Sequence, residues 1–167
     1  NTTIRGEYDV QKLTNIPVLG TIRHCDPSDV KVQTRENSKS IFAEGFRLIR
    51  SRIEFITQRK KDISVLVTSA ESGDGKTHFA INMSGIYSFV SDKVVLIDVD
   101  IRNPKLSEHL GYKDAKGLVH VLIGEATLDE VLIKDDNQLG FHFLPAGVVP
   151  PNPAELVRSE EMTKLLD

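Results

Sequence analysis

One stretch of eight residues decides the fold of this chain of 167 residues: Ala70-Glu71-Ser72-Gly73-Asp74-Gly75-Lys76-Thr77. Its spacing is that of the phosphate-binding loop called Walker A, with alanine in the place of the first glycine. Gly73 and Gly75 let backbone N–H groups approach phosphate oxygens, because glycine has no Cβ and tolerates positive φ. Lys76 is suited to bind phosphates and Thr77 to coordinate Mg²⁺. We therefore predict that a nucleotide binds at Ser72, Gly73, Asp74, Gly75, Lys76, Thr77 and His78. A glycine turn that only begins a structural helix is the alternative.

The segments on either side of the loop suit this motif. Residues 64–68 predict a strand that leads into the loop, and residues 73–90 predict the glycine loop and the helix after it. Further strands are expected at residues 94–97 and 141–144, and further helices at residues 118–123, 128–133 and 154–166. Continuous apolar strands that alternate with helices indicate an α/β fold with a parallel sheet.

Two aspartates follow the predicted strand at residues 94–97, in the sequence Asp98-Val99-Asp100-Ile101-Arg102. Ligands of open α/β sheets bind beyond the carboxyl ends of the strands, and an i, i+2 pair in extended chain points to one side. Asp98 and Asp100 are therefore placed to face one Mg²⁺ ion and to accept a proton from an incoming hydroxyl group. Solvated acids at a strand end are the alternative. Arg102 fits a phosphate contact, a neighbouring subunit or a surface ion pair.

Upstream of the loop, residues 40–57 predict an amphipathic helix. Its apolar residues recur every three or four positions and form one face: Phe42, Phe46, Ile49, Ile53 and Ile56. A different face carries three neighbouring charged residues, Glu44, Arg47 and Arg50. The first 35 residues are expected to be irregular, with a short strand or extended segment at residues 17–22 and a polar linker at residues 26–40.

Composition excludes several classes of protein. Hydrophobic residues make up 40% of the chain and charged residues 27%, which is typical of one globular domain. Cys25 is the one cysteine, so an internal disulfide and a multi-cysteine metal site are excluded. The few aromatic residues and a net charge of −3 argue against nucleic acid as a partner. Residues 1–62 contain 12 Lys/Arg against 8 Asp/Glu and the remainder 9 against 16. This asymmetry indicates a separate segment or a self-complementary assembly surface, and chance plus one basic helix is the alternative.

Together these motifs resemble one family. The Walker A stretch with residues 98–102, a motif called Walker A′, resembles the deviant P-loop ATPases. The charged residues Glu44, Arg47 and Arg50 match the E-x-x-R-x-x-R helix of the bacterial tyrosine kinases. Residues 150–156 look like the proline-rich segment of that family, and residues 8–20 are similar to its lead-in after a second membrane helix. The chain thus resembles the cytoplasmic kinase domain of Wzc/Etk-type proteins over nearly its whole length.

The resemblance implies a P-loop NTPase fold, a site and a reaction. A kinase of this type transfers a phosphoryl group from ATP to tyrosine, leaves ADP and requires Mg²⁺. Lys76, Asp98 and Asp100 would then be catalytic. Thr77 and the two aspartates would hold the metal, and Arg102 would contribute to nucleotide binding.

The resemblance also implies partners and a location. Members of the family phosphorylate tyrosines near their C-terminus, one subunit acting on the next in a ring, and regulate assembly and export of capsular or exopolysaccharide. The charged residues Glu44, Arg47 and Arg50 would lie at the interface of this homo-oligomer. A cognate tyrosine phosphatase and the polysaccharide export machinery would be further partners. Residues 1–39 would follow a membrane helix and residues 40–167 would form the kinase domain, at the cytoplasmic face of the bacterial inner membrane.

The sequence departs from the family pattern in three respects. After the proline-rich segment, no second strand ends in aspartate, where the family has its Walker B motif. The tyrosine cluster is missing as well, because Tyr8, Tyr87 and Tyr112 are scattered. Glu108 stands where some proteobacterial members have a regulatory tyrosine. We therefore expect a C-terminally truncated kinase domain that is weakly active or inactive by itself.

Two other functions are compatible with these motifs. A positioning or partition ATPase of the MinD/ParA kind would share the fold, but such proteins have a signature lysine where this chain has Glu71. A non-catalytic module could regulate polysaccharide chain length through assembly alone.

Overall fold

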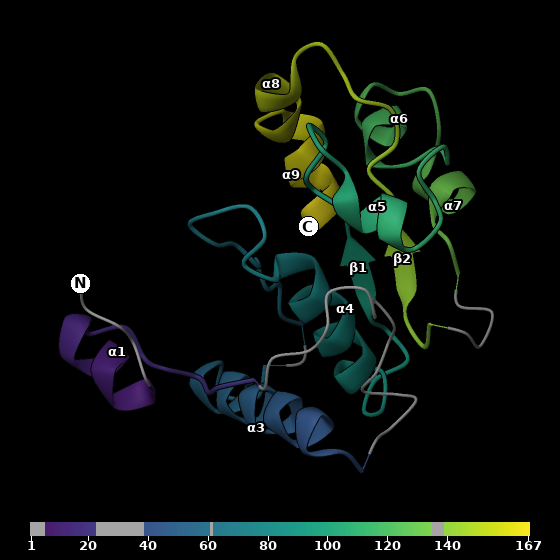
Figure 1. Cartoon of the computed structure of the whole chain (residues 1–167). Helices are drawn as coiled ribbons and strands as arrows, with labels where there is room; N and C mark the ends of the chain where they lie inside the picture. The colour runs from purple at the N-terminus through teal and green to yellow at the C-terminus, as the bar shows by residue number, and fades with distance from the viewer. Residues whose placement is uncertain (1–5, 23–38, 61, 135–138) are drawn as a thin grey trace. The chain divides into compact units, whose positions relative to one another are not determined.

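The computed structural model describes four stretches of the chain, residues 6–22, 39–60, 62–134 and 139–167 (Figure 1). The chain divides into two compact units, residues 1–87 and residues 88–167. The expected boundary after residue 39 stays a prediction. Cys25 and almost all of the expected linker lie outside the described residues.

The first unit contains α1 (Glu7–Leu13), α3 (Ile41–Ile56) and α4 (Lys76–Tyr87). Helix α3 begins after Ser40, whose hydroxyl accepts a hydrogen bond from Ala43 N at 3.1 Å. The apolar face that the periodicity of α3 predicted packs against α4. The core of the unit consists of the buried residues Phe42, Phe46, Ile49, Ile53, Met83 and Ile86.

Several expectations for the first unit are wrong. Residues 7–13 form helix α1, which buries none of its residues and therefore has no apolar face that would predict it. Ile56, in the last turn of α3, is 55% exposed. Residues 64–68 do not form the expected strand, and Leu66 is 82% exposed. Residues 17–22 form no strand either, which leaves the other expectation for them, an extended segment. A strand needs a hydrogen-bonded neighbour, and no described segment pairs with these residues.

The second unit is built on two parallel strands, β1 (Val95–Ile97) and β2 (His142–Leu144). Leu96 pairs with Phe143 at the centre of this pairing, which confirms the predicted parallel α/β arrangement. The helices of the unit are α5 (Lys105–His109), α6 (Leu118–Leu122), α7 (Leu128–Val131), α8 (Pro153–Val157) and α9 (Glu160–Leu166). Its core consists of Ile101, Leu118, Val119, Leu122, Val131, Leu144, Ala146 and Met162.

Several helices of the second unit differ from the expectation. The helix expected at residues 128–133 ends at Val131, because Ile133 pairs with Phe143. Helix α5 was not predicted at all, since its five residues are too few for a periodic pattern. The single helix expected at residues 154–166 is divided into α8 and α9. Ser159 causes this division, because its hydroxyl accepts a hydrogen bond from Met162 N at 3.2 Å and so begins a new helix.

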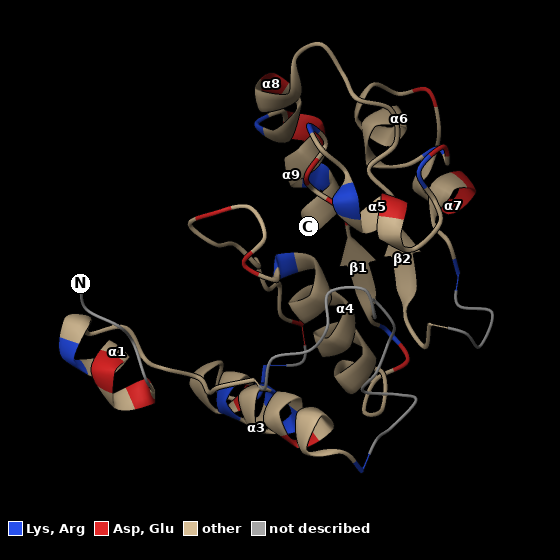
Figure 2. Ribbon diagram, viewed as in Figure 1, with Lys and Arg blue, Asp and Glu red and all other residues tan. Residues whose placement is uncertain are grey.

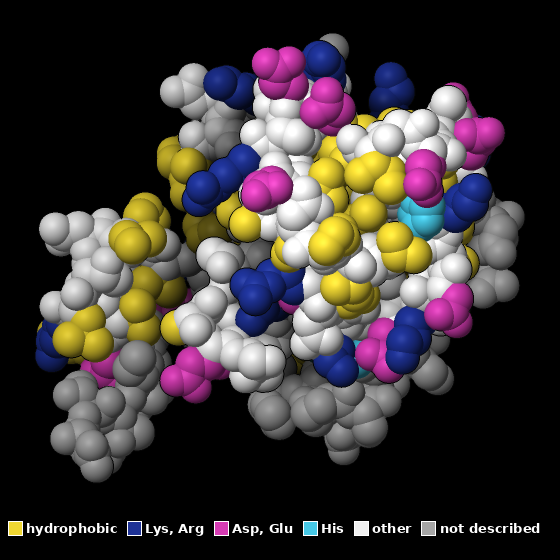
Figure 3. All heavy atoms as spheres, turned by 90° about the horizontal axis from the view of Figure 1, so that it is seen from above, with side chains coloured by type: hydrophobic (Ala, Val, Ile, Leu, Met, Phe, Trp, Pro, Cys, Tyr) yellow, Lys and Arg dark blue, Asp and Glu magenta, His cyan; other side chains and the backbone are white. Residues whose placement is uncertain are grey.

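No helix within the described ranges is long and apolar enough to cross a membrane. Hydrophobic side chains nevertheless reach the surface among charged ones (Figure 3). They include Val148 and Val149 in the loop after β2, which are 56% and 61% exposed. The loop that leads into the proline-rich segment therefore buries little of its apolar surface.

Candidate functional site

The predicted phosphate loop lies in the first unit, directly before α4. Gly73 and Gly75 have φ angles of +95° and +91°, which residues with a Cβ rarely adopt. A Cβ added at either glycine would meet no atom within 4 Å, so backbone conformation rather than space requires glycine. Thr77, in the first turn of α4, is half-buried, and the ring of His78 lies 5.4 Å from that of Phe42 between centroids.

The backbone of this loop offers hydrogen-bond donors. Within the described stretches, the N–H groups of residues 73–75 have no protein acceptor. Glu71 N, by contrast, donates to Asp74 Oδ2 at 2.9 Å, and Ser72 is exposed. Successive N–H groups in a glycine turn at the start of a long helix form a site for an anion. The loop therefore fits the phosphate groups of a nucleotide.

Lys76 reaches back across the loop. Its Nζ donates to Ser69 Oγ at 2.7 Å and to the carbonyl oxygen of Glu71 at 2.9 Å. Ser69 Oγ donates to the same carbonyl oxygen at 2.8 Å. Both acceptors are neutral, and an ionised phosphate oxygen forms stronger hydrogen bonds with an ammonium group. Lys76 is thus positioned beside the loop and free to exchange these partners for phosphate.

Asp98 lies at the end of β1 in the second unit and is 2% exposed. Its Oδ2 accepts hydrogen bonds from Ser107 N at 2.8 Å and Ser107 Oγ at 2.7 Å, and its Oδ1 accepts one from Asp100 N at 3.2 Å. Ser107 Oγ also accepts a hydrogen bond from Ala146 N at 3.0 Å. Burial raises the pKa of the Asp98 carboxyl, whereas the hydrogen bonds from Ser107 lower it. Asp98 therefore joins β1 to α5 and, through Ser107, to the loop after β2.

Asp100 has a different environment. Asp100 is exposed, and its Oδ1 accepts a hydrogen bond from Asn103 N at 3.1 Å. Arg102 is exposed as well. Asp98 and Asp100 lie between the end of β1 at Ile97 and a turn at residues 101–102, and the expectation that both carboxylates point to one side stays a prediction. The roles assigned to these residues stay predictions.

A metal would find oxygen ligands in both units. Carboxylate and hydroxyl oxygens are the ligands that Mg²⁺ prefers. The Asp100 carboxylate accepts a hydrogen bond from Asn103 N and has further lone pairs with which it could coordinate a metal ion. The described residues contain no group of three or more His, Cys, Asp or Glu side chains that could hold a metal. Thr77 belongs to the first unit and the two aspartates to the second, so their shared metal site stays a prediction.

Charged residues of both signs lie along α3 (Figure 2). Glu44 and Arg47 form an ion pair, and Arg50 Nε lies 3.5 Å from Glu54 Oε1. The side chain of Glu44 is 65% exposed, that of Arg47 31% and that of Arg50 20%. The three motif residues therefore lie along α3 as predicted, but the exposed fraction of their side chains decreases from Glu44 to Arg50.

Arg50 also connects the motif to the helix after the phosphate loop. Arg50 Nε and the Tyr87 hydroxyl are buried, and neither has a hydrogen-bond partner in the described part of the chain. Burial raises the pKa of Tyr87, the charge of Glu54 raises it further, and the charge of Arg50 lowers it. Tyr87 is the last residue of α4. An electrostatic interaction thus links the motif to α4.

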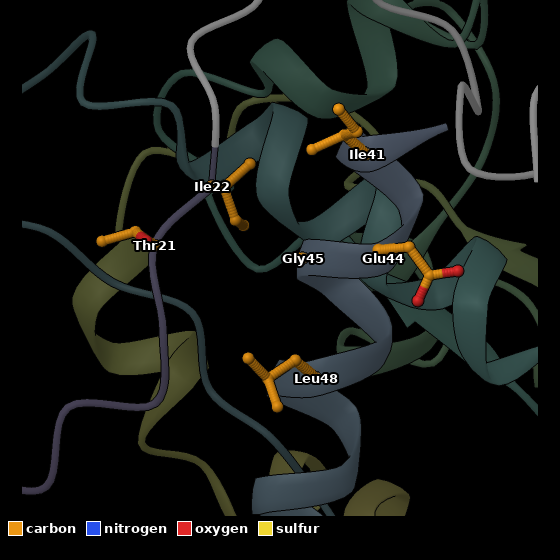
Figure 4. A pocket seen from close by; sticks show the side chains of 6 residues that line it. All are labelled: Thr21, Ile22, Ile41, Glu44, Gly45 and Leu48. Carbon is orange, nitrogen blue, oxygen red and sulfur yellow. The ribbon is translucent and has the colours of Figure 1, made fainter. Parts of the chain in front are cut away.

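An open hollow of about 550 Å³ lies beside the motif (Figure 4). Thr21 and Ile22 line one side, and Ile41 and Leu48 of α3 face it from the other, whereas the Glu44 carboxylate points away. Ile41 is 73% exposed and Leu48 49%. The surface next to the motif is therefore apolar.

Sequence reasoning missed two residues that position the predicted site. Ser69 precedes the motif and binds Lys76, while Ser107 binds Asp98 from nine positions further along the chain. A hydroxyl next to a phosphate-binding loop is a signal that could have indicated Ser69. Nothing in the local sequence indicates Ser107, because its helix was not predicted.

Comparison of sequences identifies relatives among bacterial kinases. No protein-family model matches the chain. The tyrosine-protein kinase YwqD of Bacillus subtilis is 35% identical over 127 residues, which cover 76% of this chain and 53% of that protein. The chain spans between 18% and 58% of the length of this and other curated relatives that it matches.

Comparison of structures gives the same result. The chimerical protein CapA2B2 matches with a TM-score of 0.80 and 29% identity, over 95% of this chain and 68% of that one. The kinase domain of the Escherichia coli tyrosine kinase ETK matches in fold with a TM-score of 0.82 and 23% identity, over 99% and 68% of the two chains. The phosphate loop, the parallel α/β arrangement and both comparisons lead to one conclusion: the chain has the P-loop NTPase fold and belongs to the bacterial tyrosine-protein kinases.

Proposed function

We propose that this chain provides the ATP- and Mg²⁺-dependent catalytic site of a protein-tyrosine autokinase that regulates the assembly and export of a capsular polysaccharide or exopolysaccharide. The observation that carries the proposal is the loop at residues 73–75, with its positive φ angles, its donors without protein acceptors and Lys76 beside it. A phosphate loop alone is common to many NTPases. The tyrosine kinases among the relatives favour phosphoryl transfer to tyrosine over ATP hydrolysis by a positioning ATPase.

Each predicted residue has a defined task in this proposal. Residues 72–78 bind the nucleotide phosphates through backbone N–H groups, and Lys76 neutralises negative charge on them. Thr77, Asp98 and Asp100 hold Mg²⁺, and Arg102 contacts a phosphate. Asp98 or Asp100 accepts the proton of the tyrosine hydroxyl. When bound, the ion neutralises charge on the transferred group.

The motif on α3 would serve assembly. We propose that Glu44 and Arg47 contact a second copy of the chain in a homo-oligomeric ring, beside the exposed Ile41 and Leu48. Burial of these two apolar side chains would favour association. In the same proposal the ring lies at the cytoplasmic face of the inner membrane, a cognate phosphatase reverses the reaction, and the export machinery is the target of regulation.

The test is autophosphorylation. The full-length protein is incubated with ATP and Mg²⁺, and phosphotyrosine is measured by immunoblot and mass spectrometry. We expect phosphotyrosine in the wild type and none in Lys76→Met, because the methionine side chain cannot neutralise phosphate charge. Lys93→Met is the matched control, since Lys93 is exposed and belongs to none of the predicted site motifs.

The outcomes separate the proposed functions. Phosphotyrosine that depends on Lys76 but not on Lys93 supports the kinase. ATP hydrolysis that depends on Lys76, without phosphotyrosine, would show a positioning ATPase instead. An assembly that forms without nucleotide turnover would show the non-catalytic module.

A further inference from the structure

The three tyrosines of the chain differ in their access to solvent. The Tyr87 hydroxyl is buried at the end of α4. Tyr112 is half-buried, and its ring lies 5.7 Å from that of Phe143 between centroids. Tyr8, on α1, is 68% exposed. Phosphoryl transfer requires that the phenol oxygen enter another active site, and Tyr8 alone among the three meets this condition without unpacking a core.

Helix α1, which carries Tyr8, has no buried face. None of its seven residues is buried. Isolated helices of this length are marginally stable in water, so α1 opens at little cost. Tyr8 can therefore be presented in extended form, as an acceptor in an active site must be.

The chain after α1 is attached to α3, which sets the reach of Tyr8. Arg52 Nη1 on α3 donates to the carbonyl oxygen of Val18 at 3.3 Å. Two residues further on, a Cβ added at Gly20 would lie 3.0 Å from Ile49 Cγ1, so the backbone lies directly against α3. Ten residues separate Tyr8 from Val18 and span at most roughly 35 Å when extended. Tyr8 can therefore reach acceptor positions well away from α3, up to the limit set by the length of the chain between Tyr8 and Val18.

The charged residues around Tyr8 suit a side chain whose charge changes. Glu7 and Asp9 flank it in the sequence, and Lys12 Nζ lies 4.1 Å from the centre of its ring. In the unmodified chain this contact is a cation–π interaction. A phosphate on the Tyr8 oxygen would carry close to two negative charges, for which Lys12 is a ready partner.

From these observations we propose that Tyr8 is an autophosphorylation site of this chain; the inference rests on the proposed kinase function. The Tyr8 oxygen attacks the γ-phosphorus of ATP. A bond forms between these two atoms, and the bond from the γ-phosphorus to the β,γ-bridging oxygen breaks. ADP leaves with the electron pair of that bond, and the phenol proton passes to an active-site carboxylate.

The experiment maps phosphate to single tyrosines in the full-length protein. After incubation with ATP and Mg²⁺, trypsin releases Tyr8 in the peptide of residues 6–12 and Tyr112 in the peptide of residues 106–113. We expect one phosphoryl group on the first peptide and none on the second. Tyr8→Phe should remove this signal, Tyr112→Phe should preserve it, and Lys76→Met should abolish it.

Two results would overturn the inference, and they differ from failure of the proposed function. Phosphotyrosine elsewhere in the protein, with the peptide of residues 6–12 always unmodified, would exclude Tyr8 while the kinase function stands. Phosphate on this peptide in Lys76→Met as well would assign the modification to another enzyme. Absence of phosphotyrosine everywhere would remove the proposed function itself.

Discussion

Replacing Ser107 with alanine tests how the buried carboxylate of Asp98 is held. The change removes the hydroxyl that donates to Asp98 Oδ2 at 2.7 Å and accepts from Ala146 N at 3.0 Å. Ser107 is 1% exposed and Asp98 2%, so water cannot replace either bond without entering the core. The Ala146 N–H would be left without its acceptor.

The expected loss of stability follows from these two bonds. A hydrogen bond to a charged group contributes roughly 1.5–3 kcal/mol, and an unsatisfied buried N–H costs about 1–3 kcal/mol. We expect Ser107→Ala to lower the free energy of unfolding by about 4 kcal/mol. Ser40→Ala is the matched control, because it removes the helix-capping hydroxyl of α3 and should cost only about 1 kcal/mol.

Urea denaturation followed by circular dichroism measures both variants. A double-mutant cycle with Asp98→Asn isolates the bond to the charge, and we expect a coupling energy of about 1.5–3 kcal/mol. If Ser107→Ala costs no more than Ser40→Ala, or the coupling is below about 0.5 kcal/mol, the reasoning that Ser107 holds Asp98 is refuted.

Three further predictions concern single positions. Gly75→Ala should destabilise the chain by about 1–2 kcal/mol, because Gly75 has a φ of +91°, which alanine rarely adopts. Gly6→Ala is the control and should be nearly neutral, because Gly6 has an extended backbone. Thermal denaturation that shows equal losses of stability for the two variants would contradict this prediction. Tyr87→Phe should leave the free energy of unfolding unchanged or raise it by up to about 1 kcal/mol, since the hydroxyl that is removed is buried without a hydrogen-bond partner among the described residues. A marked loss of stability in urea denaturation would contradict this, because it would show that the hydroxyl does form a hydrogen bond. The backbone N–H and the hydroxyl of Thr127 both donate to the Glu130 carboxylate and lower its pKa. These bonds stabilise the fold while Glu130 is ionised, so the wild type loses their contribution to folding stability as the pH falls through the lowered pKa. Thr127→Ala removes the hydroxyl but keeps the backbone N–H, so it should return the pKa of Glu130 only part of the way towards its usual value in a carboxyl ¹³C titration; an unchanged pKa would contradict the contribution of the hydroxyl.

The parts of the molecule that depend on local sequence could be predicted. The glycine loop, α4 and the apolar face of α3 each follow from residues a few positions apart, and the structure has them where they were expected. The parallel pairing of β1 with β2 was likewise indicated by two continuous apolar runs.

The parts that depend on distant contacts could not. Residues 64–68 have the composition of a strand, but a strand exists only where a neighbour pairs with it. Ser107 acquires its role from Asp98 and from Ala146, which is 39 positions away. Helix α1 has no buried face, and so no periodicity from which to predict it.

The central claim is that the phosphate loop of this chain serves transfer of a phosphoryl group to tyrosine. Its most direct test is phosphoamino-acid analysis of the full-length protein after incubation with radiolabelled [γ-³²P]ATP and Mg²⁺. Our account predicts label in phosphotyrosine in the wild type and in Lys93→Met, and none in Lys76→Met. Label that is absent from tyrosine in the wild type, or that persists in Lys76→Met, would contradict it.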